Sequence, residues 1–266
     1  MSRSHSKSGL GSKISRSDDI GKRQAIIYDG DHLIWQMSKA VSSHFWIDAL
    51  EISQAAGDLT TWPARVGISP TQPTGSMRPS WNPATGEVEF DAVGEALIST
   101  TSWAATGAMT LIAMVTKDSF SVAFDVVAEY KRYFVGGGWS MFFNTVARAF
   151  AAHGKNPNYQ DAFETLTASG TNCWAMVCDS SLAAGSQLRL WLNGVELTGL
   201  TTSGGGAAGN YPAGNLFIGA RDDGVGGLER PLGGGIRELI AYTVALTPSQ
   251  VVDVSAAMSA KAAALQ

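Results

Sequence analysis

Three carboxylate side chains alternate along residues 87–91, which read Glu-Val-Glu-Phe-Asp. Alternate residues of a strand point to the same face, so Glu87, Glu89 and Asp91 would lie together. Glycoside hydrolysis needs such paired carboxylates, one of them as a proton donor. The segment directly follows the turn sequence Asn-Pro-Ala-Thr-Gly at 82–86. We therefore expect an edge strand with a solvated acidic face, and no catalytic pair.

Nucleophilic catalysis has little support in the sequence. The four histidines, His5, His32, His44 and His153, stand in no motif with a serine or cysteine, and the chain has no Gly-x-Ser-x-Gly elbow. His5 falls in the N-terminal segment. The other three are expected to be surface or capping residues, and the protein is not expected to be an enzyme.

Asp222-Asp223-Gly224 offers the best pair of oxygen ligands for Ca²⁺. Adjacent aspartates beside a glycine are more typical of a turn, so no cofactor is expected and calcium is kept as an alternative. Glycine runs at 136–138, 204–206 and 233–235 lack the Lys-Ser/Thr of a phosphate loop. They are interpreted as turns or close backbone approaches.

A candidate ligand-binding pair lies on the segment 187–193. Leu188, Leu190 and Leu192 alternate with Arg189 and Trp191, which predicts a strand with an inner and an outer face. On the outer face Trp191, beside Arg189, could stack on a sugar or a protein partner. The remaining tryptophans are expected mainly in the core. They are Trp35, Trp46, Trp62, Trp81, Trp103, Trp139 and Trp174.

Charge divides the chain into two parts, an arm at 1–23 and a domain at 24–266. The whole chain has a net charge of −4, but the Ser/Gly-rich arm carries six basic residues against two acidic ones. Such a segment cannot fold alone and should dock on an acidic partner, while the acidic domain is not expected to bind nucleic acid. The predicted partner-binding residues are Arg3, Lys7, Lys13, Arg16, Lys22 and Arg23.

The pattern of short apolar runs predicts an all-β domain. Asp29-Gly30 within 25–35 and Asn193-Gly194 are hairpin turn signals. Residues 57–86 hold five prolines and should form a long ordered loop. Thr247 as N-cap and Pro248 at the first helical position predict a helix that continues to Lys261. Strands are expected at 87–92, 109–116, 120–127, 139–146, 173–178, 187–193, 215–220 and 235–244.

Cys173 and Cys178 are five residues apart on one predicted strand, so they point to opposite faces, roughly 16 Å apart. Disulfide partners need Cα atoms within about 7 Å, so two buried free thiols are expected, as suits a reducing cytoplasm. The N-terminal segment lacks the apolar core of a secretion signal, and no run of about 18 apolar residues predicts a membrane helix.

Several segments, taken in order, resemble the laminin G-like jelly rolls of the concanavalin A-like lectin/glucanase superfamily. They are the strand–turn–strand 188–196, the glycine-bounded strand 216–224, the strand 232–242, and the helix start at 245–250. Upstream, residues 46–49, Trp62, 78–79 and 88–91 resemble the N-terminal half of many phage-encoded members. The resemblance covers roughly residues 45–262 and implies an antiparallel β-sandwich with a short C-terminal helix and an extended N-terminal arm.

The superfamily includes sugar-binding lectins, glycosidases and phage structural proteins, so the resemblance of this chain to it leaves the function of the chain open. Laminarinase-like members carry Glu-x-Asp-x-Glu, whereas residues 87–91 have Glu and Asp exchanged at the last two positions. The resemblance therefore implies a non-enzymatic virion protein of a tailed phage, a capsid decoration or head-fibre protein made in the host cytoplasm. Its partners would be other virion proteins or neighbouring copies, with no membrane or nucleic acid. The alternative is a carbohydrate-binding module for host glycans, and a glycosidase ranks third.

Overall fold

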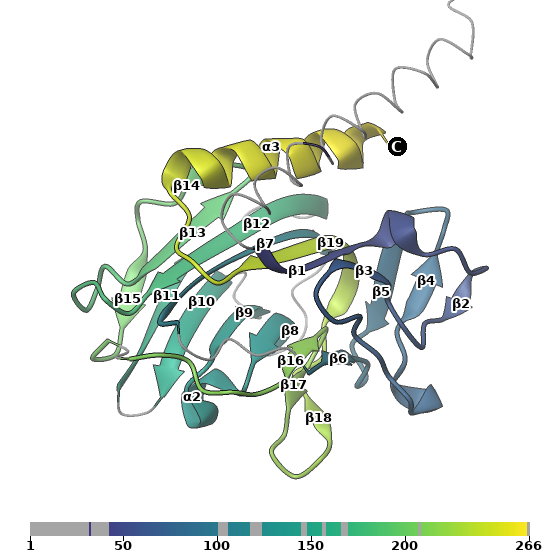
Figure 1. The fold of residues 1–266 in the computed structure, drawn as a ribbon, viewed down its shortest axis with the longest axis horizontal. Helices are drawn as coiled ribbons and strands as arrows, with labels where there is room; N and C mark the ends of the chain where they lie inside the picture. The colour runs from purple at the N-terminus through teal and green to yellow at the C-terminus, as the bar shows by residue number, and fades with distance from the viewer. Residues whose placement is uncertain are drawn as a thin grey trace, which may run out of the picture.

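The protein is described by a computed structural model over residues 32, 43–100, 106–117, 124–144, 148–155, 158–165, 170–206 and 209–264. Two antiparallel sheets pack face to face, and one long helix lies across the outer face of the larger sheet (Figure 1). The expected antiparallel sandwich with a C-terminal helix is confirmed. The arm at 1–23 and the hairpin expected at 25–35 fall outside the described residues, His32 excepted.

The larger sheet has ten strands. Its main path runs through β14 (Val195–Glu196), β13 (Leu188–Leu192), β12 (Gly170–Asp179), β7 (Ala108–Lys117), β19 (Gly233–Tyr242), β5 (Glu87–Asp91), β4 (Ser80–Asn82) and β2 (Gly57–Asp58). The first half of β19 pairs with β5, and its second half pairs with β1 (Ser43–Asp48), which also pairs with β3 (Ala64–Val66). Strand β19 is therefore central to the sheet.

The smaller sheet has seven strands. Its order is β15 (Thr201–Ser203), β11 (Asn158–Thr165), β10 (Arg148–Lys155), β9 (Trp139–Asn144), β8 (Phe124–Tyr130), β16 (Leu216–Ile218) and β6 (Leu97–Ser99). A separate hairpin, β17 (Arg221–Asp222) with β18 (Leu228–Glu229), projects below the sandwich in Figure 1. Short helical turns are η1 (Ala49–Glu51), η2 (Gly75–Met77) and α2 (Tyr133–Gly136).

The main core fills the space between the two sheets. On β13, Leu188 and Leu190 are buried in it and Leu192 packs against it, as the alternation predicts. Asn193 and Gly194 both have positive φ, 51° and 77°, and Leu192 pairs with Val195. These angles match the type I′ turn that joins β13 to β14.

The C-terminal helix α3 (Pro248–Ala264) begins with a reciprocal cap. The Thr247 N–H donates to Gln250 Oε1 at 2.9 Å, and the Gln250 N–H donates to Thr247 Oγ1 at 3.4 Å. This capping box satisfies two backbone donors that the first turn leaves open. The predicted start of the helix is confirmed, and its end lies three residues beyond the expected Lys261.

A second core lies between α3 and the outer face of the larger sheet. Val251, Val254 and Met258 of α3 pack there against apolar side chains of β7, β12, β13 and β19. Strand β12 therefore has both faces buried, with Cys173 in the helix-side core and Cys178 in the main core. Both cysteines are free and buried, as expected. Burial on both faces explains why the middle parts of β7 and β12 are nearly continuous apolar runs.

Two expectations about secondary structure need correction. Residues 57–86 are not a plain loop, because β2, β3, η2 and β4 lie within them. Strands β10 and β11 were not expected; their Ala, Gly, His and Gln residues lack a strong β pattern, and they are held by full pairing with each other. Among the described residues, no helix is both long and apolar enough to cross a membrane.

Candidate functional site

The pair Arg189 and Trp191 does not form an exposed binding face. Trp191 is only 1% exposed, because α3 covers this face of the sheet. The Arg189 guanidinium lies 4.8 Å from the centre of the indole ring and makes two hydrogen bonds of 2.6 Å to the Glu196 carboxylate. The expectation that Trp191 offers its ring to a ligand is wrong, since the helix already occupies that surface.

The carboxylates of β5 are not a uniformly solvated row. Strand β5 lies between β19 and β4, so the expected edge position is wrong. Asp91 is exposed and Glu89 is half-buried, but Glu87 is buried and accepts from Arg237 Nε at 2.7 Å and Thr116 Oγ1 at 2.5 Å. An ionised carboxylate that is committed to a neighbouring arginine is a poor proton donor.

Asp222 and Asp223 shape the loop of the β17–β18 hairpin. Asp222 Oδ1 accepts the Gly224 N–H at 2.8 Å, and Asp223 Oδ1 accepts the N–H groups of Val225 and Gly227 at the same distance. These hydrogen bonds lower the pKa of Asp223. The carboxylates act as turn acceptors, and the calcium alternative stays a prediction.

His32, His44 and His153 were expected to be surface or capping residues, and His153 is not at the surface. It is buried, and its Nδ1 lies 3.2 Å from the hydroxyl of Tyr211. Burial lowers its pKa from 6.5 to about 4, so the ring is neutral at pH 7. His32 is exposed, as expected. His5 lies outside the described residues, as do the six basic residues assigned to partner binding.

The tryptophans are structural wherever they are described. Each of the six is 6% exposed or less, so none offers a free ring to a sugar. They are Trp46, Trp62, Trp81, Trp139, Trp174 and Trp191. Trp35 and Trp103 are not among the described residues. The expectation of core packing is confirmed for the five other than Trp191, and Trp191 is buried as well, against its predicted outward position.

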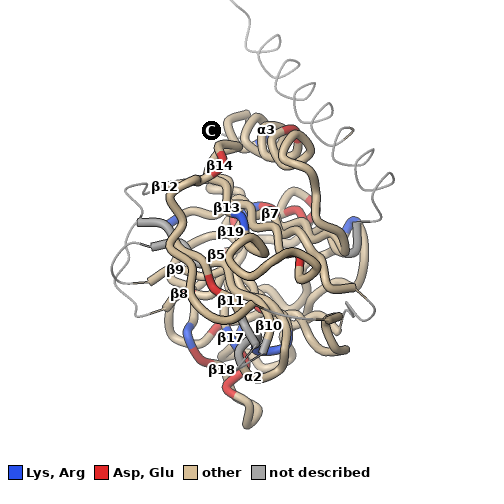
Figure 2. The backbone as a smooth tube through the Cα atoms, turned by 90° about the vertical axis from the view of Figure 1, so that its left-hand side faces the viewer, with Lys and Arg blue, Asp and Glu red and all other residues tan. Residues whose placement is uncertain are grey.

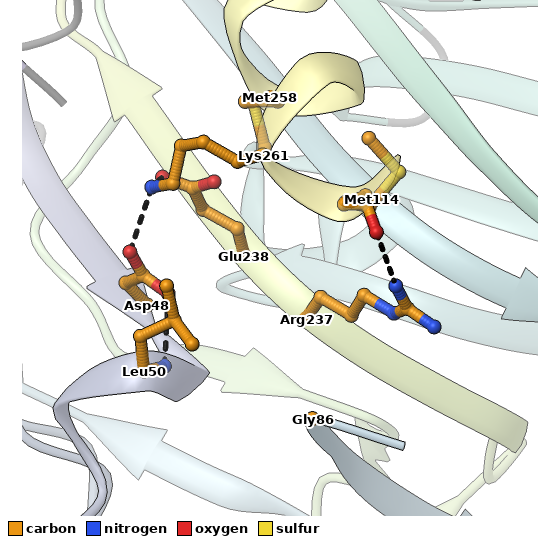
Figure 3. Close-up of a pocket in the computed structure, with 9 residues that line it drawn as sticks. Asp48, Leu50, Gly86, Met114, Arg237, Glu238, Met258 and Lys261 are labelled. Carbon is orange, nitrogen blue, oxygen red and sulfur yellow. Dashed lines mark hydrogen bonds and ion pairs between the residues drawn. The ribbon is translucent and has the colours of Figure 1, made fainter. Parts of the chain in front are cut away.

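A buried group of charged side chains fixes α3 to the sheet (Figure 3). Lys261 Nζ of α3 lies 2.8 Å from Asp48 Oδ2 of β1 and 3.0 Å from Glu238 Oε1 of β19. The Trp46 indole N–H donates to the same Glu238 oxygen at 2.8 Å, and Arg65 lies 3.3 Å from Asp48. Burial, and next the Asp48 carboxylate, raise the pKa of Glu238 to about 7.

A β-bulge produces this charged group. The pairing of β19 with β7 shifts between Ile236 and Glu238, so Arg237 is an extra residue in the strand. A bulge lets two consecutive side chains point to the same side of a sheet. Arg237 accordingly reaches Glu87 and donates to the carbonyl of Ala262 in α3 at 3.2 Å, while Glu238 reaches Lys261.

The space beside this charged group is too small for a ligand. Asp48, Arg237, Glu238 and Lys261 border a cavity of about 10 Å³, no more than a single water molecule requires. The close-up in Figure 3 shows Lys261 directed toward Asp48 beside Glu238 beneath α3, whereas Arg237 extends away from these three side chains. Their chemistry is therefore that of a structural anchor, which the sequence alone did not reveal.

A larger hollow, which we call the end groove, opens at one end of the sandwich. Four chain segments meet there: the start of β7, the end of β12, the loop before β16, and the link from β19 to α3. Its volume is about 640 Å³, within the range of small-molecule sites. The lining residues are Thr106, Gly107, Ala108, Asp179, Ser180, Ser181, Gly209, Asn210, Thr243, Val244 and Ala245.

Hydrogen bonds hold the segments of the end groove together. Thr106 Oγ1 donates to the Thr243 carbonyl at 2.9 Å, and Ser180 Oγ donates to the Gly209 carbonyl at 3.0 Å. The Ser180 N–H donates to the Gly107 carbonyl at 3.0 Å. A Cβ on Gly107 would meet Ser180 Oγ at 2.2 Å, so this close approach needs glycine.

Polar groups remain available within the end groove. The Asp179 carboxylate accepts the Ser181 N–H at 2.9 Å and the Ser181 hydroxyl at 2.6 Å, both through Oδ1. Within the described part of the chain, Asp179 Oδ2 and the Asn210 side chain make no hydrogen bond, and Asn210 is exposed. Carboxylate, amide and backbone groups of this kind can bind hydroxyl groups of a ligand.

Comparison with known proteins assigns the family. Residues 90–252 match a family model described as the concanavalin A-like lectin/glucanases superfamily, and this match covers more than half of the chain. The chain belongs to this family, as the sequence segments indicated. No curated protein sequence matches the chain.

Solved structures with the same sandwich are distant in sequence. The sialidase of Trypanosoma rangeli, in complex with sialic acid, is 13% identical with a TM-score of 0.53, and the match covers 82% of this chain and 33% of that one. The binding domain of botulinum neurotoxin serotype D/C is 9% identical with a TM-score of 0.52, covering 79% and 50%. The chain thus spans about a third to a half of these proteins, and the likeness establishes a lectin-like fold.

Proposed function

We propose that this domain is a non-catalytic glycan-binding module whose ligand lies in the end groove. The observation that carries the proposal is a polar groove of about 640 Å³, formed by strand ends and loops at the end of a lectin-like sandwich. Loops positioned by a rigid scaffold are where binding sites concentrate. The matched sialidase and neurotoxin binding domain support the choice of glycans over other ligands.

The carboxylates support binding without hydrolysis. Canonical glycoside hydrolysis needs two carboxyl groups, about 5 to 10 Å apart, on either side of the scissile bond. The described lining of the end groove contains one carboxylate, that of Asp179. On β5, Glu87 is paired with Arg237 and is buried. A glycosidase would need a second acid that the described groove does not supply.

Titration calorimetry of the full chain against neutral oligosaccharides tests the proposal, together with the variant Asn210→Ala. Asn210 lines the groove and Asn215 is exposed outside it, so Asn215→Ala is the matched control. We expect Asn210→Ala to weaken binding by about ten-fold, the cost of a ligand hydrogen bond, at an unchanged melting temperature. The control should bind as the parent does. Equal affinity in all three proteins, no binding of any glycan, or release of reducing sugar would overturn the proposal.

A virion role for the whole protein rests on charge asymmetry in the sequence. Residues 1–23 carry a net charge of +4 on a chain whose net charge is −4, which favours docking of the arm on an acidic shell. A decoration or fibre protein could also present a glycan-binding domain, so the two roles are compatible. Deleting residues 1–23 should abolish attachment to particles and leave glycan affinity unchanged. Full attachment of the truncated protein would exclude the arm as the docking device.

A further inference from the structure

The charge of the end groove restricts what it can bind. Asp179 is the one ionisable residue in the described lining, and none of the lining residues is Lys or Arg. The neighbouring segments 101–105 and 207–208 contain no basic residue in the sequence either. Charged residues are sparse along most of the described backbone, as the colours of Figure 2 show. An acidic ligand in this groove would therefore find no cation to neutralise it.

Asp179 is held in a fixed position at the groove. Its N–H donates to the Gln187 carbonyl at 2.8 Å, and the Ser181 backbone and hydroxyl both donate to Oδ1. The carboxylate thus has little freedom to turn away from a ligand. Hydrogen bonds from hydroxyl groups to an ionised carboxylate are about twice as strong as neutral ones. The same negative charge repels a second carboxylate placed within a few ångströms.

We propose that the end groove selects uncharged glycans and rejects sialylated ones, with Asp179 as the specificity-determining residue. This inference rests on the proposed glycan-binding function. Asp179 accepts hydrogen bonds from the hydroxyl groups of a neutral sugar through Oδ2, and Asn210 supplies a second polar contact from the loop before β16. Sialic acid carries a carboxylate, which Asp179 excludes by like-charge repulsion with no basic partner to offset it.

The test compares matched glycans that differ only in a terminal sialic acid. An array of neutral oligosaccharides and their sialylated counterparts identifies the pairs, and calorimetry measures one pair, such as lactose and 3′-sialyllactose. We expect the neutral member to bind at least about ten-fold more tightly at low salt, as like-charge juxtaposition implies. The ratio should fall as the salt concentration rises, because salt screens charges at an exposed site.

The variant Asp179→Asn removes the charge while its Oδ1 can still accept the Ser181 groups. It should narrow the neutral-to-sialylated affinity ratio several-fold. The matched control is Asp91→Asn, since Asp91 also accepts a backbone N–H two residues ahead but does not line the groove. That control should leave the ratio unchanged.

The outcomes separate this inference from the proposed function. If the sialylated glycan binds as tightly as the neutral one or more tightly, the specificity inference is wrong, and glycan binding stands. An unchanged ratio in Asp179→Asn would also overturn the role of this residue. If no glycan of either kind binds, the proposed function fails and the inference fails with it.

Discussion

Replacing Lys261 by methionine would test whether the buried charged group holds α3 on the sheet. Lys261 contacts carboxylates from two strands, Asp48 at 2.8 Å and Glu238 at 3.0 Å, and only 3% of its side chain is exposed. Methionine keeps most of the length of lysine and has a similar unbranched, apolar stem, so the substitution removes the charge with little change in packing. Asp48 keeps Arg65 at 3.3 Å, whereas Glu238 retains the Trp46 indole N–H and no cation among its described contacts.

The expected loss is large because a buried charge is left unpaired. Removal of one member of a buried ion pair costs about 3–5 kcal/mol, a large fraction of the about 5–15 kcal/mol that stabilises a typical domain. With an m-value of about 3 kcal/mol/M, the urea midpoint should fall by about 1–2 M. Protonation of Glu238 limits the loss, since the neutral acid no longer needs a cation.

The loss should depend on pH in a defined direction. Burial raises the pKa of Glu238 to about 7 from its usual 4.5, so the folded state binds a proton more readily than the unfolded chain. Glu238 therefore stabilises the fold fully below about pH 4.5, and this contribution is lost as the pH rises through about 7. Without Lys261 the pKa rises further, so the deficit of the variant should be largest at pH 8 and shrink toward pH 5.5.

Urea melts of the full chain at pH 5.5 and pH 8, followed by far-UV circular dichroism, measure this effect. The double variant Glu238→Gln with Lys261→Met should recover part of the loss, because the stranded carboxylate is gone. A deficit of equal size at both pH values, or a double variant no more stable than Lys261→Met alone, would refute the charge argument. The contribution of Lys261 would then be one of packing.

Three further predictions concern strands β13, β5 and β12. Leu190→Ala should lower the free energy of unfolding by about 2–5 kcal/mol, as a truncation in the main core. Arg189→Ala should lower it by less than about 1.5 kcal/mol in the same urea melts, because its ion pair is partly exposed. Similar losses in the two variants would contradict the assigned faces of β13. Glu87→Gln should lower the free energy of unfolding by about 1–3 kcal/mol by weakening the buried contact with Arg237, while Asp91→Asn should change it by less than about 0.5 kcal/mol. Burial raises the pKa of both cysteines on β12. Neither thiol should therefore react with an aromatic disulfide reagent at pH 8 until urea unfolds the chain. Rapid labelling of the native protein would contradict this and show that β12 is accessible.

The features that the sequence predicted well are local. The alternation of Leu188, Leu190 and Leu192, and the turn at Asn193-Gly194, depend on neighbouring residues alone. The start of α3 likewise follows from Thr247 and Pro248, whose cap is complete within four residues. Such local structure is determined by residues that are close in the sequence, so the sequence alone placed β13, the turn after it and the start of α3 correctly.

The features that the sequence missed depend on distant contacts. Alternation predicts two faces for β13 but cannot show that α3 covers the second one, which is why Trp191 was assigned to the surface. The bulge at Arg237 and the burial of Glu87 depend on the pairing of three strands. Asp179 ends β12 and Asn210 lies in the loop before β16, so residues far apart in the sequence form the end groove and it has no sequence signature.

The central place of β19 constrains how the domain forms during synthesis. Residues 233–242 pair with β7 on one side and with β5 and β1 on the other, so they join parts of the sheet that are made long before them. A nascent chain that has reached only residue 232 therefore carries strand edges that have no partner, and such edges invite aggregation. The larger sheet can close only when β19 has left the ribosome. Folding of the domain thus waits for β19, and a premature stop before this strand should yield an insoluble fragment instead of a shortened, functional domain.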